Sequence, residues 1–236
     1  MGVEGMILCG FQKLTLLDFP GRVAATVFTG GCNLRCPFCH NASLVTNTKD
    51  TPILSVDEVL NYLRRRQGIL DGVCVTGGEP TLQVDLPDFL RRIKAMGYAV
   101  KLDTNGTHPD MLRRVVFEGL ADYVAMDIKS CREKYGITAG KIPFDLAPIE
   151  ESIRFLMSGS LPYEFRTTVV RGIHNVSDFT AIGQWIAGAE RYFLQGFVDS
   201  GSLIGGGFAA FSPDEMRECL TAVREFIPNA QLRGIE

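Results

Sequence analysis

The sequence predicts an α/β fold with parallel strands, arranged either as an open doubly wound sheet or as a partly closed barrel. Short β-branched runs alternate with helical patterns at roughly 25 to 45 residue intervals, about the length of one strand and helix unit. A strand, helix, strand crossover makes the two strands parallel. At 236 residues the chain has the length of one barrel, so we expect a single domain over residues 1–236.

Six runs are predicted to form strands because they are short, apolar or β-branched, and bounded by turn residues. In chain order they are residues 23–29, 73–76, 99–103, 123–127, 164–170 and 192–198. Residues that carry chemistry follow four of them directly, and the carboxyl ends of parallel strands are where functional side chains gather.

Between these runs, apolar residues recur at helical spacing, which predicts helices packed on a sheet. Capping boxes, Ser55 with Glu58 and Ser212 with Glu215, mark the start of two of these helices. The apolar stripes are Val56, Val59, Leu60 and Leu63; Leu86, Phe89, Leu90 and Ile93; Phe179, Ile182 and Ile186; and Met216, Leu220 and Val223.

The composition excludes two classes of partner. A net charge of -3 with 22% charged residues gives no basic field for nucleic acid or for anionic lipid. The first residues lack the pattern of a secretory leader, and no later run reaches the roughly 18 apolar residues of a membrane span. We therefore expect a cytoplasmic protein.

Three of the seven cysteines, Cys32, Cys36 and Cys39, lie within eight residues. Thiolates at this spacing can hold an iron–sulfur cluster from one loop, and the absence of a fourth nearby Cys leaves one iron open. A zinc site with His40 as the fourth ligand is the alternative, although adjacent ligands close a tetrahedron poorly. The other cysteines lie in apolar or helical contexts typical of buried side chains, and they are Cys9, Cys74, Cys131 and Cys219.

Glycines and acidic residues mark the ends of later strands. Gly77 and Gly78 precede Glu79 and Pro80. Glycines allow the backbone to approach a ligand closely. For this motif alone, a tight turn that ends at the proline is an equal interpretation. Asp103 and Asp127 end two further strands. Two carboxylates at one barrel mouth would repel unless a cation lay between them, whereas each alone is more often a strand-end cap.

The cysteine spacing, with Phe38 before Cys39, resembles the signature of the radical S-adenosylmethionine (SAM) superfamily. Thr76–Pro80 resembles its GGEP motif, and Asp103–Gly106 and Met126–Lys129 resemble segments of the activating enzymes of glycyl radical enzymes. The resemblance implies a partial (β/α)6 TIM-like barrel with the cofactor site at the strand C-terminal face. It also implies one 4Fe-4S cluster on Cys32, Cys36 and Cys39, with SAM chelating the open iron.

The same resemblance implies further site residues. A sodium or potassium ion would be held by Asp103, Thr104, Met126 and Asp127. The residues implied to contact SAM are Phe38, Gly77, Gly78, Glu79, Pro80, Asp103, Asn105, Asp127, Lys129, Arg166 and Gln195. Gln195 stands where pyruvate formate-lyase activating enzymes commonly have His, and a buried, satisfied amide is an equal interpretation for it.

Likeness along nearly the whole chain points to one branch of the superfamily. The opening Gly10–Arg22 and the Cys39-His40-Asn41 sequence resemble anaerobic ribonucleoside-triphosphate reductase activating proteins and, more distantly, pyruvate formate-lyase activating enzymes. This implies cleavage of SAM to a 5′-deoxyadenosyl radical that takes hydrogen from a glycine of a partner glycyl radical enzyme, with flavodoxin or ferredoxin as electron donor. Asp18 would face the partner, although a plain Pro-Gly turn explains it equally well.

No side chain is expected to act as acid or base, because the cluster and the cofactor carry the chemistry. Structural roles are expected for His40, His108 and His174. Two other functions share some of these features. A radical SAM enzyme with a small-molecule substrate would have the same cofactor motifs, and a non-catalytic iron–sulfur or zinc module would neither bind nor cleave SAM.

Overall fold

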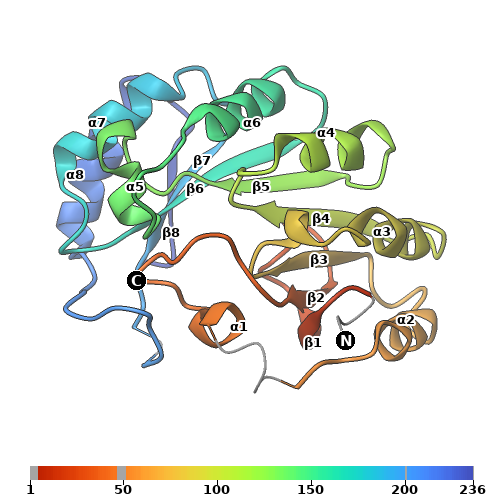
Figure 1. The fold of residues 1–236 in the computed structure, drawn as a ribbon. Coiled ribbons are helices and arrows are strands. Elements are labelled where there is room, and N and C mark those ends of the chain that lie inside the picture. The colour runs from red at the N-terminus through yellow and green to blue at the C-terminus, as the bar shows by residue number, and fades with distance from the viewer. Residues whose placement is uncertain (1–4, 47–51, 200, 236) are drawn as a thin grey trace. The chain divides into compact units, whose positions relative to one another are not determined.

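The computed structural model describes residues 5–46, 52–199 and 201–235, and the chain divides into two compact units (Figure 1). The first unit comprises Met1–Asn33 and Ser43–Val124, and the second comprises Leu34–Ala42 and Ala125–Glu236. The boundary between them passes through the cysteine segment, through helix α1 (Ala42–Thr46) and through strand β5 (Tyr123–Asp127).

The strands of the first unit confirm the predicted parallel arrangement. β2 pairs with β3 and β3 with β4 in parallel, with Thr26 opposite Cys74 and Cys74 opposite Lys101. β1 joins β2 in an antiparallel pair through a turn in which Gly21 has a φ of 71°, a value that favours glycine. These strands are β1 (Leu8–Thr15), β2 (Ala24–Thr29), β3 (Gly72–Gly77) and β4 (Ala99–Thr104).

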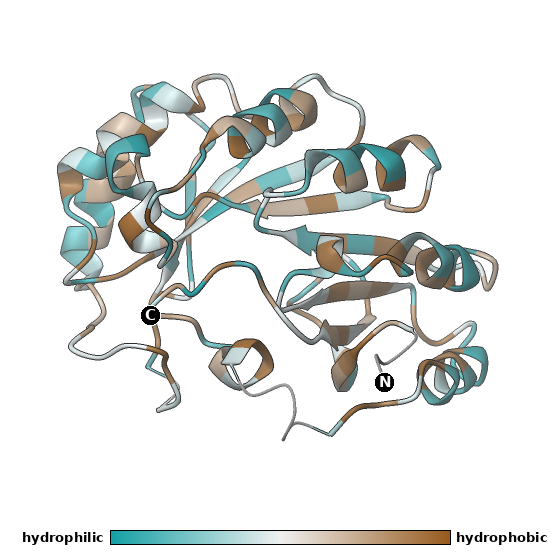
Figure 2. Cartoon of the chain, in the orientation of Figure 1, coloured by the Kyte–Doolittle hydropathy of each residue, from teal (hydrophilic) through white to brown (hydrophobic). Residues whose placement is uncertain are grey.

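Two helices of the first unit, α2 and α3, agree with the prediction from the sequence. Ser55 and Glu58 form the expected capping box of α2, and the apolar stripes of α2 and α3 are buried. Figure 2 shows hydrophilic and hydrophobic sides on both helices, as their position on a sheet requires. The helices are α2 (Val56–Arg64), the 3-10 turn η1 (Pro80–Leu82), α3 (Leu86–Lys94) and α4 (Pro109–Phe117).

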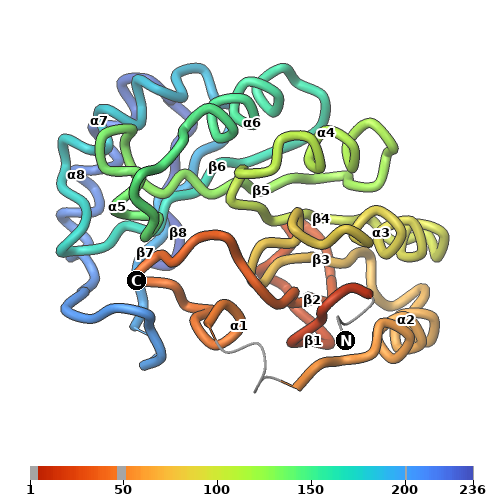
Figure 3. Tube along the Cα trace, in the orientation of Figure 1, coloured from red at the N-terminus to blue at the C-terminus, as the bar shows by residue number. Residues whose placement is uncertain are grey.

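The second unit repeats the same plan. β6 (Tyr163–Val169) pairs in parallel with β7 (Tyr192–Gly196), and β7 with β8 (Gln231–Arg233). Helices α7 and α8 pack side by side, as the Cα trace in Figure 3 shows. The helical elements are η2 (Arg132–Lys134), α5 (Tyr135–Thr138), α6 (Ala147–Met157), α7 (Val176–Trp185) and α8 (Pro213–Arg224).

The structure adds elements to the six predicted strands and four predicted helices. β1 was not predicted because half of its residues are polar or exposed, as suits an edge strand that pairs antiparallel, and β8 has only three residues. Helices α4 and α6 were also missing from the prediction. In the part of the chain that the structure describes, no helix combines the length and apolar character needed to cross a membrane.

Candidate functional site

Two glycines of the GGEP motif hold the start of the cysteine segment in the first unit. Gly78 N and Glu79 N donate to the carbonyls of Thr29 and Gly31, both at 2.8 Å. A Cβ on Gly78 would lie 1.9 Å from the Gly31 carbonyl oxygen, and one on Gly77 would lie 2.4 Å from Thr29 N. The backbone of residues 29–31 therefore leaves no room for a side chain at either position, so both positions require glycine.

The Glu79 side chain is 1% exposed and fully engaged by protein donors. Its Oε1 accepts hydrogen bonds from Thr81 N (3.1 Å), Thr81 Oγ1 (2.5 Å) and Thr104 Oγ1 (2.8 Å), and its Oε2 accepts one from Asn105 N (2.6 Å). Burial raises the pKa of Glu79, and these hydrogen bonds only partly oppose it. Glu79 thus ties the end of β3 to the end of β4, which is a positioning role.

Asn105 links the end of β4 to Cys32. Its Nδ2 donates to Asn33 Oδ1 (3.1 Å) and lies 3.7 Å from Cys32 Sγ. Its Oδ1 accepts from Thr107 Oγ1 (2.6 Å), and Asn33 Nδ2 donates to that same hydroxyl (2.8 Å). An amide N–H directed at a cysteine sulfur stabilises thiolate character, because hydrogen bonds to the charged form favour it.

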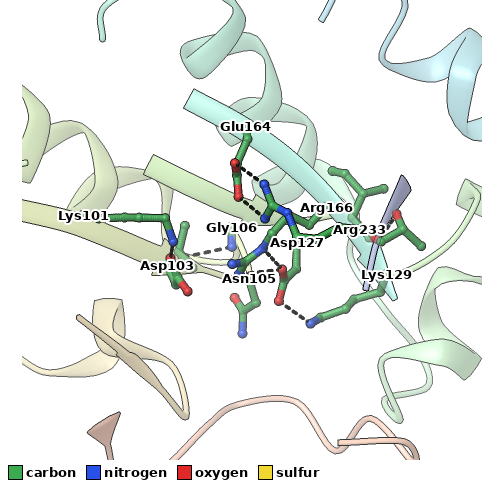
Figure 4. A network of polar contacts seen from close by, with 12 residues as sticks. Lys101, Asp103, Asn105, Gly106, Asp127, Lys129, Glu164, Arg166 and Arg233 are labelled. Atoms are coloured by element: carbon green, nitrogen blue, oxygen red, sulfur yellow. Dashed lines mark hydrogen bonds and ion pairs between the residues drawn. The ribbon is translucent and has the colours of Figure 1, made fainter. Parts of the chain in front are cut away.

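Asp103 forms an ion pair with a lysine of the same strand. The ammonium of Lys101, whose side chain is 2% exposed, contacts Asp103 Oδ1 (Figure 4). The same ammonium lies 3.9 Å from Cys74 Sγ. Thr104, the other member of the predicted cation site on β4, is buried and donates to Glu79. Both residues implied to hold a cation from β4 therefore have protein partners.

The rest of the cysteine segment lies in the second unit and is held by backbone contacts. Arg35 N donates to the Ala139 carbonyl (2.9 Å), and a Cβ on Gly140 would lie 2.0 Å from the Arg35 carbonyl oxygen. Gly205 N donates to the Pro37 carbonyl (2.7 Å), and Cys39 N donates to that of Cys36 (3.1 Å). Cys36 is buried and Cys39 is partly exposed.

Aromatic contacts fix the side chains that flank Cys39. Phe38 is buried with its ring 6.4 Å from that of His174, and His40 stacks on Phe197 at 5.5 Å. The stacking gives His40 a packing contact, and its structural role stays a prediction. His174 Nδ1 accepts from Val170 N (3.1 Å) and its Nε2 is 2.9 Å from the Lys129 carbonyl, which assigns the proton to Nε2.

A cationic pair surrounds Asp127 at the end of β5 (Figure 4). Lys129 Nζ lies 2.9 Å from Asp127 Oδ2, and Arg166 Nε donates to Oδ1 at 2.9 Å. Burial alone would raise the pKa of Asp127, but Arg166 and Lys129 outweigh it and hold that pKa well below its usual range. Burial opposes the charge on Lys129, yet Asp127 and Cys36 raise its pKa. Two cations against one carboxylate leave this group with one net positive charge.

Glu164, two residues before Arg166 on β6, forms an ion pair in which its carboxylate is buried. Arg233 from β8 donates to both Glu164 oxygens at 2.9 and 3.0 Å, and its guanidinium lies 3.7 Å from the centre of the Phe193 ring. The bidentate geometry satisfies a carboxylate that is fully buried. Gln195, two residues after Phe193 on β7, is half-buried.

The remaining predicted residues are also accounted for. Asp18 lies in the turn before β2, where its Oδ2 accepts a hydrogen bond from the Thr26 hydroxyl (2.5 Å). Pro80 begins η1, and Met126 is fully buried in β5. The four cysteines outside the motif are all buried, as predicted. Within the described ranges, no three His, Cys, Asp or Glu side chains are arranged to hold a single metal ion.

Sequence reasoning missed the residues that position the motif residues. Lys101, Thr81, Thr107, Gly140 and Arg233 each contact a predicted site residue or its neighbour. A local signal was present for three of them. Lys101 lies two residues before Asp103 on the same side of a strand, and Thr81 and Thr107 each lie two residues after the residue they bond, Glu79 and Asn105. Gly140 and Arg233 become neighbours of the site only through the fold.

Comparison with known proteins places the chain among enzymes of one superfamily. A family model described as the radical SAM superfamily matches residues 26–175. A Methanocaldococcus jannaschii protein, provisionally named a glycyl-radical enzyme activating enzyme, is 30% identical over 236 aligned positions. The match covers 97% of this chain and 96% of that protein.

Two further relatives match about half of the chain. The pyruvate formate-lyase-activating enzyme of Listeria monocytogenes is 35% identical over 128 residues, covering 50% of this chain and 51% of that enzyme. The 7-carboxy-7-deazaguanine synthase of Halobacterium salinarum is 40% identical over 111 residues, covering 45% of this chain and 42% of that enzyme.

Solved structures share the fold. A domain of a pyruvate-formate lyase-activating enzyme from Bacteroides vulgatus has a TM-score of 0.57 at 20% identity, covering 69% of this chain and 99% of that chain. Streptococcus suis SuiB bound to S-adenosylmethionine has a TM-score of 0.68 at 13% identity, covering 86% of this chain and 48% of that chain. These similarities confirm the predicted α/β architecture with parallel strands.

Proposed function

The chain is an enzyme of the radical SAM superfamily, and we propose that it activates a glycyl radical enzyme by removing a hydrogen atom from a glycine of that partner. The observation that carries this proposal is the 30% identity, over 97% of the chain, with the Methanocaldococcus jannaschii protein provisionally named an activating enzyme. The conclusion also agrees with the motifs read from the sequence.

In this proposal Cys32, Cys36 and Cys39 hold one 4Fe-4S cluster, and the open iron is chelated by SAM. The donor set fits, because each of the three thiolates can bind one iron of the cluster, which leaves the fourth iron open. When bound, the cluster and SAM supply the one-electron cleavage that yields a 5′-deoxyadenosyl radical. The chain supports thiolate character at Cys32 through the Asn105 amide, 3.7 Å from its sulfur.

The charges of the second unit fit an anionic group of the cofactor. Lys129 and Arg166 together carry one positive charge more than Asp127 compensates. Arginine suits a carboxylate because its planar fork can bond both oxygens. We therefore propose that Lys129 and Arg166 orient the carboxylate of SAM, with Asp127 fixing both cations. The backbone of Gly77–Pro80 and the side chains of Phe38, Asn105 and Gln195 would complete the contacts.

The protein substrate is the finer part of the proposal. A glycine must leave the interior of its own enzyme to reach the activating enzyme, so binding is expected to be transient. Asp18 is the proposed partner contact, although one of its oxygens already accepts from Thr26. Flavodoxin or ferredoxin would deliver the electron, and the reaction would take place in the cytoplasm.

A radical SAM enzyme acting on a small molecule is the second candidate function. The 40% identity with a 7-carboxy-7-deazaguanine synthase over 45% of the chain favours it. That match covers less than half of either protein, whereas the match to the activating enzyme covers nearly all of both. Full-length similarity therefore ranks the activating enzyme first.

The experiment that tests the shared chemistry is anaerobic reconstitution followed by incubation with SAM and a reductant. We expect about four iron and four sulfide per chain, and release of 5′-deoxyadenosine and methionine. Cys32→Ser, Cys36→Ser and Cys39→Ser should each abolish both results. Cys219→Ala, in a buried cysteine of α8, is the matched control and should retain iron. Stoichiometric zinc with no SAM cleavage would contradict the proposal.

A further inference from the structure

One ammonium group is buried inside the first unit at the end of the sheet. Lys101 and Asp103 project from the same side of β4, and their side chains are only 2% and 12% exposed. Burying an ammonium is costly unless a carboxylate or hydrogen-bond acceptors receive it. Asp103 meets that requirement directly (Figure 4), and the sulfur of Cys74 lies 3.9 Å from the same ammonium.

This pairing changes what Asp103 requires from solution. A sodium or potassium ion was expected because Asp103 and Asp127 were treated as uncompensated carboxylates. In the first unit, however, Asp103 faces Lys101, and in the second unit Asp127 faces Lys129 and Arg166. A free cation brought to Asp103 would lie beside an ammonium of the same sign, which disfavours its binding. The residues therefore do not fit a monovalent metal ion at Asp103.

We infer that Lys101 is a built-in counter-cation of Asp103, which takes the place of the expected sodium or potassium ion. A covalently attached cation is present at every ionic composition, so its effect does not depend on the salt. The stability of the protein, and its affinity for SAM under the proposed function, should therefore be the same in any monovalent cation. Only the statement about SAM rests on the proposed function.

Thermal stability under anaerobic conditions tests the pairing without reference to activity. The midpoint of unfolding is measured at matched ionic strength in potassium, sodium and tetramethylammonium chloride. The wild type should give one midpoint in all three salts. Lys101→Met should unfold roughly 5 °C or more lower in tetramethylammonium, with recovery in sodium or potassium, because a small ion can then reach Asp103. Lys101→Arg should behave like the wild type.

Two variants separate the counter-cation role from loss of any lysine. Lys101→Met combined with Asp103→Asn removes both charges and should be insensitive to the salt. Lys94→Met breaks a more exposed pair of the same unit, in which the Lys94 ammonium lies 2.7 and 2.8 Å from the Asp122 oxygens. This matched control should also show no dependence on the type of cation.

The affinity for SAM provides the second readout. Wild-type affinity should agree within about twofold in the three salts, whereas Lys101→Met should bind roughly tenfold more weakly in tetramethylammonium than in potassium. The inference is overturned if potassium stabilises the wild type, or if the wild type binds SAM tenfold more tightly in potassium. It is also overturned if Lys101→Met has the same unfolding midpoint and the same affinity for SAM in all three salts. If Lys101→Met does not fold, the wild-type comparison and the double variant decide. Failure of the wild type to bind SAM in any salt contradicts the proposed function and leaves the stability test intact.

Discussion

Replacing Glu79 by Gln tests whether the end of β3 is held to the end of β4 by one buried carboxylate. The carboxylate accepts four hydrogen bonds, three at Oε1 and one at Oε2. Gln offers one oxygen and one NH2 group, so whichever way it is oriented the NH2 meets a backbone N–H, that of Thr81 or that of Asn105. A buried donor left without an acceptor costs about 1 to 3 kcal/mol.

The full cost includes the loss of charge. Hydrogen bonds to a charged group contribute about 1.5 to 3 kcal/mol each, and neutral ones about 0.5 to 1.5 kcal/mol. Relief from burying the charge offsets part of that loss, since burial raises the pKa of Glu79 despite its hydrogen bonds. We therefore expect Glu79→Gln to lower the free energy of unfolding by about 2 to 4 kcal/mol.

Differential scanning calorimetry of the anaerobic protein measures this effect. For a chain of this length, about 2 to 4 kcal/mol corresponds to a fall in the midpoint of roughly 5 to 15 °C. Glu118→Gln is the control, because Glu118 pairs with Arg91 and Arg114 at the surface, where ion pairs contribute little. Equal midpoints for Glu79→Gln and the wild type would refute the assigned positioning role.

Two further predictions concern the second unit. Burial lowers the pKa of His174, so below about pH 6.5 the unfolded chain binds more protons than the folded chain, and the protein should become less stable as the pH is lowered. His174→Gln should remove this part of the pH dependence when unfolding midpoints are measured from pH 8 to 5.5. An unchanged pH dependence in the variant would contradict this prediction. Gly140→Ala, whose Cβ would lie 2.0 Å from the Arg35 carbonyl oxygen, should displace the cysteine segment and lower iron content after reconstitution. Gly159→Ala is the control, because this glycine also has a positive φ but no atom lies within 4 Å of the added Cβ, and the variant should keep its iron. Equal iron content in the two variants would contradict the prediction.

The sequence was most informative where local chemistry determines the structure. The capping boxes at Ser55 and Ser212 begin helices as expected, because cap and third residue satisfy each other's backbone donors locally. The predicted strands were recognised because their apolar runs are buried in parallel pairing. β1 was missed because an edge strand can carry polar residues, such as Gln12 and Lys13, at exposed positions.

The sequence was enough to name the motif residues proposed for the site, but not most of the residues that contact and support them. Cysteine spacing and the strand-end motifs identify residues that lie close together in the chain. The pairing of Glu164 with Arg233 joins residues 69 positions apart, and no local pattern predicts such a contact. The cation expectation shows the same limit, because it considered the carboxylate of Asp103 without the lysine that the strand places beside it.

The most direct test of the central claim is transfer of a labelled hydrogen from a partner glycine to the cofactor's adenosyl group. Reduced, reconstituted enzyme is incubated anaerobically with SAM and a glycyl radical enzyme from the same genome, an anaerobic ribonucleotide reductase first, containing α-deuterated glycine. The account predicts deuterium in 5′-deoxyadenosine together with a glycine-centred doublet in the electron paramagnetic resonance spectrum, both lost when the partner's glycine is changed to Ala. Release of unlabelled 5′-deoxyadenosine that no protein partner accelerates, but that a small metabolite does, would contradict it.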